Sequence, residues 1–139
     1  MTDRKILYVG VAGFGGAILR VELGKIIFSM STNSVFPYPT LLINIIGSFL
    51  LAFFLEYANS KTYFSTHLKV AISTGFLGSF TTFSTFSVES IHLLQIGAYP
   101  TAIIYIILSF VLGFLFSLLG IKTGKSVSKD YKTGLNKYK

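Results

Sequence analysis

Four long stretches of apolar residues divide this chain, and no other feature limits its fold as strongly. A helix that crosses a bilayer needs about 20 mostly apolar residues, and the stretches that meet or approach this length are residues 6–30, 40–58, 68–94 and 101–121. They leave almost nothing for a water-soluble domain among 139 residues, of which 52% are hydrophobic and 12% charged. An ordinary soluble domain is roughly a quarter charged. We therefore predict an all-α membrane protein, one domain over residues 1–139 with four transmembrane helices.

The basic residues are distributed unevenly between the predicted spans. Two precede the first span, Lys61 and Lys69 lie between the second and third, and six lysines follow the fourth in a basic tail, residues 122–139. The connections on the other side, residues 29–39 and 96–100, contain no lysine or arginine. Because positively charged loops stay in the cytoplasm, we predict a cell-membrane protein with both termini cytoplasmic. The tail could also contact anionic lipid, whereas the lysines form no continuous aqueous face and predict no nucleic-acid partner.

The third span has an unusual composition. Between Gly75 and Phe86 it contains two glycines, five hydroxyl residues and four phenylalanines. Glycine and threonine weaken a regular helix, and hydroxyl side chains can satisfy backbone groups that a break releases. We predict that this helix is broken near its middle, which would expose helix ends and free carbonyls suited to ion binding. The alternative is an intact helix on which Phe76, Phe80 and Phe83 form a packing stripe.

Polar side chains also occur at membrane depth in the second and fourth spans. Asn44 lies on a helical face of small residues, where it either contacts a passing solute or joins two helices. A polar track or a close-packed seam is indicated by four residues that recur at intervals of four, Tyr105, Ser109, Gly113 and Ser117. The chain has no cysteine, and no nucleophile, base and orienting group occur together, so an enzyme is not predicted.

Three segments carry specific patterns. Gly75 to Phe86, followed by Glu89, is similar to G-x-x-G-G-x-T-T-F-S-T-F-S-x-E. Thr40 to Ser48 resembles G-T-L-x-x-N-x-x-G-S, and Gly13 to Arg20 resembles G-G-x-x-G-A-x-x-R-Y. All three patterns belong to the CrcB/Fluc family of fluoride-specific ion channels, which the chain resembles over all four spans. It departs from the family pattern at Pro39, Ser79, Val21 and Ala52.

The resemblance implies an antiparallel dimer of four-helix subunits through which fluoride leaves the cytoplasm passively, down its electrochemical gradient. It assigns Asn44 as the pore amide and Phe83 with Phe86 as an aromatic box. Hydroxyl donors near the ion and a polar track along the fourth span are implied at Ser84, Thr85, Tyr105 and Ser109. The remaining assignments are structural: Arg20 near the vestibule, Glu89 as the family's glutamate, and the backbone carbonyls of Gly78 and Thr81 as ligands of a structural sodium ion at the dimer centre.

The sequence leaves alternatives open for the dimer partner and for the function. Homodimers of this family insert in both orientations, which requires balanced charge, so the strong bias of this chain predicts one fixed orientation and a heterodimer with an oppositely oriented paralogue rather than a homodimer. A small proton-coupled multidrug exporter is also an antiparallel four-span dimer, but it needs a membrane carboxylate in its first span. Glu22, between Arg20 and Lys25, is the only one available there. The chain could also be the non-conducting partner subunit of a heterodimeric fluoride channel.

Overall fold

The described part of the chain consists of helices joined by short connections. A computed structural model describes residues 2–31, 34–61 and 64–136, and contains no strand within them. In chain order the elements are α1 (Thr2–Met30), α2 (Tyr38–Asn59), α3 (Thr66–Val70), a π-helical segment η1 (Ala71–Leu77), α4 (Gly78–Phe80), α5 (Phe83–Gln95) and α6 (Tyr99–Asn136). Three of these helices, α1, α2 and α6, are long and apolar enough to cross a membrane.

The third predicted span contains a break between two helical segments, as the sequence predicted. Helical structure continues through α3, η1 and α4 as far as Phe80, and the next two residues are extended, Thr81 with ψ 158° and Thr82 with ψ 117°. A new helix, α5, begins at Phe83, where the Thr82 hydroxyl accepts a hydrogen bond from the Thr85 N–H. This is the usual way in which a threonine caps a helix start. The predicted break near the middle of this span is thus present, at Thr81 and Thr82.

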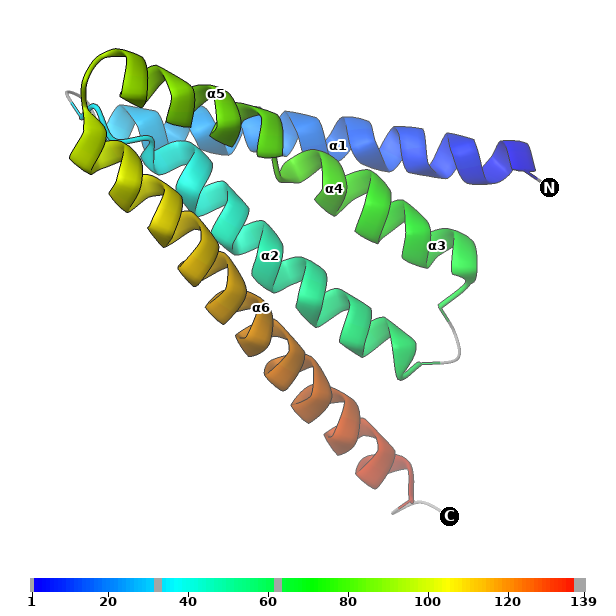
Figure 1. Cartoon of the computed structure of the whole chain (residues 1–139). Helices are drawn as coiled ribbons and strands as arrows, with labels where there is room; N and C mark the ends of the chain where they lie inside the picture. The colour runs from blue at the N-terminus through cyan, green and yellow to red at the C-terminus, as the bar shows by residue number, and fades with distance from the viewer. Residues whose placement is uncertain (1, 32–33, 62–63, 137–139) are drawn as a thin grey trace.

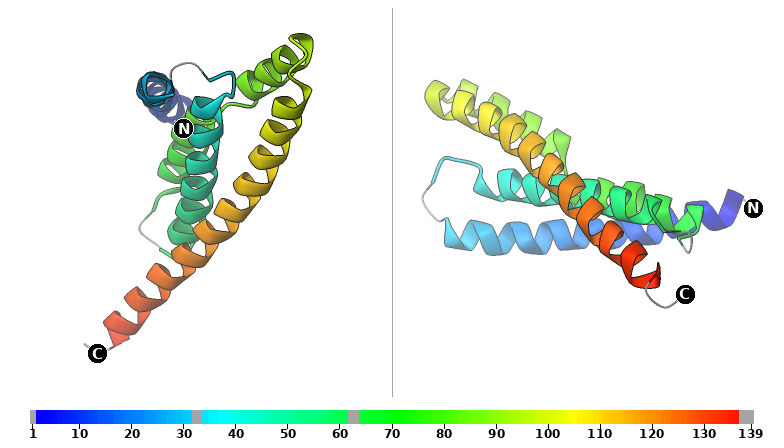
Figure 2. Two further views of the ribbon diagram at one scale, coloured as in Figure 1. Left: turned by 90° about the vertical axis from the view of Figure 1, so that its left-hand side faces the viewer. Right: turned by 90° about the horizontal axis from the view of Figure 1, so that it is seen from below.

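The helix ends gather at two opposite ends of the molecule. The start of α1, the end of α2, the start of α3 and the end of α6 point to the same side of the molecule, where α1 and α6 diverge, and the α5–α6 turn lies at the opposite end (Figures 1 and 2). That turn contains Gly97, whose positive φ of 74° favours glycine. All three basic groups of the sequence therefore belong to one end. The fourth helix is longer than the span predicted from hydropathy, because no proline follows residue 121 and the helix continues to Asn136.

Small residues set the closest approaches between helices. A Cβ atom on Gly16 would collide with the carbonyl oxygen of Phe76, and one on Gly75 would lie 2.7 Å from the carbonyl oxygen of Val9, so α1 packs directly on η1. The same holds between α6 and α2, where Gly120 faces the Phe49 carbonyl. Such contacts are expected in a bilayer, where lipid provides no hydrophobic drive for helices to associate.

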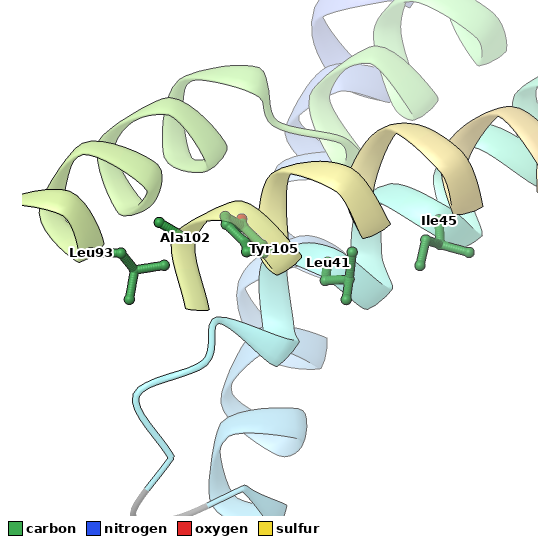
Figure 3. Close-up of a cluster of buried hydrophobic side chains, with 5 residues drawn as sticks. All are labelled: Leu41, Ile45, Leu93, Ala102 and Tyr105. Carbon is green, nitrogen blue, oxygen red and sulfur yellow. The ribbon is translucent and has the colours of Figure 1, made fainter. Parts of the chain in front are cut away.

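A small apolar cluster joins α2, α5 and α6. It consists of Leu41, Ile45, Leu93, Ala102 and Tyr105, of which the last two are fully buried (Figure 3). Outside this cluster most large apolar side chains are exposed, and only 6% of the most apolar window of α1 is buried. A chain with this distribution requires a membrane, another chain, or both to cover it.

Candidate functional site

The side chain of Asn44 on α2 holds the broken backbone. Its Nδ2 donates to the Thr82 carbonyl at 3.0 Å, and its Oδ1 accepts from the Thr82 N–H at 2.8 Å. Both backbone groups of an extended residue inside the membrane region are thereby satisfied by one amide. The sequence left open whether Asn44 joins helices or faces a solute, and the geometry shows that it does join α2 to the break.

The same amide retains one unused donor. An amide nitrogen carries two N–H groups, and Thr82 is its one acceptor in the described part of the chain. Asn44 also lines an open pocket of about 260 Å³ between α2, the break and α6. Its walls are Asn44, Gly47, Ser48, Leu51, Thr81, Thr82, Phe83, Phe86, Ser109 and Phe110. Four of the seven residues predicted to line an ion path thus meet here: Asn44, Phe83, Phe86 and Ser109.

Aromatic rings cover one side of this pocket. The Phe86 ring lies 5.7 Å from Phe83 and 5.3 Å from Tyr105, measured between ring centroids, and meets Phe110 edge to face at 5.9 Å. Phe83 is 75% exposed and points away from the packed part of the chain. The edge of an aromatic ring carries partial positive charge, so a group of rings with different tilts can present edges to an anion.

Glu89 connects three helices beside the pocket. One carboxylate oxygen accepts a hydrogen bond from the Thr40 hydroxyl at 2.9 Å, and the other accepts from the Tyr105 hydroxyl at 2.7 Å. Hydrogen bonds to an ionised group are stronger than those between neutral groups, so this contact fixes α5 against α2 and α6. Tyr105 is fully buried and does not line the pocket itself, but its ring contacts the ring of Phe86, which does.

Ser84 and Thr85 lie at the start of α5, next to the pocket. The Thr82 hydroxyl donates to Thr85 Oγ1 at 2.9 Å and lies 3.3 Å from Ser84 Oγ. Both hydroxyls are therefore close to the positive end of the α5 helix dipole, although neither residue is among those that line the pocket.

Of the four residues predicted to form a track on α6, Ser109 lines the pocket and Ser117 lines a neighbouring groove, whereas Tyr105 and Gly113 line neither. A second groove of about 370 Å³ runs along α2 and α6 and is lined by Ser117, Asn59 and Glu56 among others. It shares Ser48 and Leu51 with the pocket, so the two hollows adjoin. Together they extend from the break towards the basic end of the molecule.

The other predicted site residues lie apart from the pocket or at its edge. Gly78 is exposed and Thr81 half-buried at the break, where the last carbonyls of a helix lack intrahelical partners. Arg20 on α1 is half-buried and lines neither hollow. Glu22 is exposed and forms an ion pair with Lys25 at 2.8 Å.

Three contributors were not singled out from the sequence. Thr82 lay inside the quoted third-span pattern, but its roles as cap and as partner of Asn44 depend on the exact position of the break. Thr40 began the second pattern, yet its contact with Glu89 spans 49 residues and has no local signal. Phe110 follows Ser109 directly and resembles any other lipid-facing phenylalanine in an apolar span.

Comparison with known proteins gives a consistent result. The sequence model of the family described as "CrcB-like protein, Camphor Resistance (CrcB)" matches residues 7–121. The chain is 48% identical to "Fluoride-specific ion channel FluC 1" of Desulfitobacterium hafniense over 83% of its length and 98% of that relative. It is 49% identical to "Fluoride-specific ion channel FluC" of Campylobacter lari over 83% of its length and 93% of the relative. It is 41% identical to "Fluoride-specific ion channel FluC 1" of Bacillus cereus over 94% of its length and 96% of that relative.

Proposed function

The chain belongs to the CrcB family, whose relatives named above are ion channels and not enzymes, and from this membership we propose that it forms a fluoride-specific channel in the cell membrane. In this proposal fluoride leaves the cytoplasm passively, down its electrochemical gradient. The observation that carries it is the pocket at the break, where the free N–H of Asn44 and the rings of Phe83 and Phe86 line one hollow.

The chemistry of the pocket suits a small, strongly hydrated anion. Fluoride gives up water only where fixed donors replace it, and this pocket offers the second N–H of Asn44 together with aromatic edges. The Ser109 hydroxyl also lines the pocket, but it donates to the Tyr105 carbonyl at 2.7 Å and would have to rotate to reach an anion. The described lining contains no cationic side chain that would hold an anion too tightly to release it. A site that binds by several weak contacts meets the requirement that a conducted ion both enters and leaves.

The direct test is ion efflux from liposomes that contain the purified chain alone. We expect rapid fluoride efflux and no chloride efflux, and loss of the fluoride signal in Phe86→Ile and Asn44→Asp protein that is still incorporated. Chloride efflux at a comparable rate would contradict the selectivity. Absence of efflux from the chain alone, and also from the chain mixed with a paralogue, would contradict the channel itself. Efflux that is restored by the paralogue and survives the pore substitutions in this chain would identify it as the non-conducting subunit.

The proposal includes an antiparallel dimer. The pocket is open on one side, and Phe83, 75% exposed, is directed out of the subunit. A second chain placed across this face would close the pocket and would cover an aromatic ring that belongs to the pattern. The large exposed apolar area of α1 and α6 supports the same conclusion, since lipid and a partner must divide it between them.

A structural sodium ion between the two chains fits the residues at the break. Sodium prefers hard oxygen ligands, and backbone carbonyls supply them without placing a carboxylate in the membrane. Gly78, exposed, and Thr81 lie where α4 ends and its carbonyls lose their helical partners. When bound, the ion would neutralise the partial charges of these carbonyls and so hold two chains together. We expect purification with choline in place of sodium to lower the dimer fraction on size exclusion, whereas an unchanged fraction would contradict the ion's role.

The charge pattern supports one orientation for this chain. Its basic residues other than Arg20 and Lys25 belong to the segments at the end of the molecule towards which both termini point (Figure 1), and positively charged ends remain in the cytoplasm. In the cell, an antiparallel partner would then be a differently charged paralogue, whereas copies of this chain reconstituted from detergent can enter the bilayer in both orientations and pair with each other. Because the chain has no cysteine, single cysteines at Ser126 and Ser34 would report the orientation of the two ends. We expect an impermeant thiol reagent to label Ser34→Cys from outside the cell and not Ser126→Cys; equal labelling of both would contradict a fixed orientation.

The exporter alternative has weaker support. Its required carboxylate, Glu22, is 58% exposed and paired with Lys25 on the same helix, away from the pocket. A carboxylate that exchanges protons during transport must lie at the substrate site. We therefore keep the channel as the single proposed function.

A further inference from the structure

We propose that a second hollow, at the basic end of the molecule between α1 and α3 with η1, binds an anionic phospholipid. Its volume is about 1000 Å³, and it shares no lining residue with the ion pocket. Figure 1 shows α3 beside the N-terminal half of α1, the two elements that enclose it. Cavities of this size accommodate ligands as large as a drug molecule or a lipid headgroup with part of its chain. The inference does not depend on the channel function.

The outer part of this hollow offers donors for a phosphate group. Its polar lining residues are Arg4, Tyr8, Ser65 and His67, and no carboxylate is found among the lining residues that the structure describes. The His67 Nδ1 is buried and lacks a hydrogen-bond partner in the described chain. No described hydrogen bond therefore fixes the ring through that atom, and rotation about χ2 lets either ring nitrogen donate to a ligand oxygen. An arginine fork beside hydroxyl donors is a common arrangement for phosphate recognition.

The inner part of the hollow is apolar, as a lipid chain requires. Its remaining lining residues are Val11, Ala12, Leu68, Ala71 and Ile72. Along α1 the lining changes from Arg4 to Ala12, a rise of about 12 Å at 1.5 Å per residue. The sequence of charged, hydroxyl and apolar groups thus follows the helix axis inward from the chain terminus. A phospholipid has the same order of groups along the bilayer normal.

The position of the hollow favours an anionic headgroup in particular. It lies at the end of the chain that carries Lys5, Lys61 and Lys69 in addition to Arg4. This is the end expected in the cytoplasm, where the leaflet surface is negatively charged. Arg4, the one of these basic residues that lines the hollow, should contribute about fivefold to affinity, since about 1 kcal/mol is typical of a basic residue at an anionic lipid surface. The phosphate of a zwitterionic lipid can accept the same hydrogen bonds, but its headgroup cation cancels the net charge that attracts the basic end.

The chain has no tryptophan, which allows a site-specific measurement. We would place one tryptophan in the hollow by Tyr8→Trp, and a control tryptophan at the other end of α1 by Phe28→Trp. The full-length protein in nanodiscs would be titrated with phosphatidylglycerol or phosphatidylcholine that carries the same brominated acyl chains. We expect Trp fluorescence of the Tyr8→Trp protein to be quenched about fivefold more effectively by phosphatidylglycerol. The Phe28→Trp protein should show no preference.

The basic residues are then tested in the Tyr8→Trp background. Arg4→Gln with His67→Gln should abolish the preference, whereas Lys5→Gln, which removes an equal charge from a residue outside the lining, should leave it within about twofold. Arg4→Gln alone, which removes the same charge as Lys5→Gln, should lower the preference several-fold. Equal effects of Lys5→Gln and Arg4→Gln would show general attraction to the basic end and overturn the proposal. A lack of quenching by either lipid would show that another protein chain covers the hollow, and would overturn it as well.

Discussion

Replacement of Asn44 tests the link between the break and the pocket most directly. Asn44→Ala removes both hydrogen bonds to Thr82, at 3.0 and 2.8 Å, and leaves a backbone N–H and C=O without their partner. A buried group that loses its partner costs about 1–3 kcal/mol, and Thr82 is only 8% exposed. The vacated space adjoins an open pocket, so water restores part of the loss. We expect a net destabilisation of about 2–3 kcal/mol.

Asn44→Asp distinguishes the hydrogen bond that Asn44 donates from the one that it accepts. A carboxylate can still accept from the Thr82 N–H, but its second oxygen would face the Thr82 carbonyl at the position that the amide nitrogen holds. The loss of stability should therefore equal or exceed that of Asn44→Ala, and the added negative charge should suppress anion flux further. Asn59→Ala, at the exposed end of the same helix, is the matched control for stability; it is not a control for transport, because Asn59 lines the groove that adjoins the pocket.

The assay pairs unfolding with transport for each variant. Stability would be measured by thermal unfolding in one detergent, followed by circular dichroism, and transport by fluoride efflux from liposomes at matched protein content. We expect both variants of Asn44 to unfold at lower temperature than Asn59→Ala and to lose fluoride efflux. If Asn44→Ala unfolds at the same temperature as Asn59→Ala, Asn44 does not hold the break and the reasoning fails.

Three further predictions follow from other contacts. Gly47→Ala should destabilise the protein by about 1–3 kcal/mol relative to Gly113→Ala in the same thermal assay, because a Cβ on Gly47 collides with the break whereas one on Gly113 finds its nearest neighbour at 3.8 Å. Tyr105→Phe removes a hydrogen bond to Glu89 and keeps the ring, so about 1.5–3 kcal/mol of stability should be lost; an unchanged unfolding temperature would refute the role given to that contact. Phe83→Ile, at a side chain that is 75% exposed, should lower fluoride efflux in liposomes with no loss of thermal stability of the detergent-solubilised subunit.

The sequence predicted the features that depend on local composition. The apolar runs indicated the long helices, and glycine with hydroxyl residues between Gly75 and Phe86 indicated the break, which the structure places at Thr81 and Thr82. The extent of the fourth helix was underestimated, because hydropathy marks where the membrane ends and not where the helix ends. Residues 122–136 are polar, but they contain no proline and the helix continues through them.

Features that depend on distant contacts were beyond local reasoning. The bonds from Asn44 to Thr82 and from Thr40 to Glu89 join residues 38 and 49 positions apart. Periodicity assigns each side chain to a face of its own helix, but it does not say which face meets which. For the same reason, periodicity placed Tyr105 on one line with Ser109 but could not show that its ring is fully buried in the subunit and contacts Phe86.

The geometry of the break suggests why a stable subunit and an ion site can share the same residues. A broken helix in a membrane is costly unless its freed groups are satisfied, and here Asn44 and the Thr82 hydroxyl satisfy them. Each does so without using all of its hydrogen-bonding capacity, because the amide keeps one N–H and the pocket beside it remains open. A substitution that removes the unused N–H of Asn44 also removes the N–H that donates to the Thr82 carbonyl. The stability of the break and the binding of an anion are therefore not independent traits in this chain, and substitutions of Asn44 should lower both together.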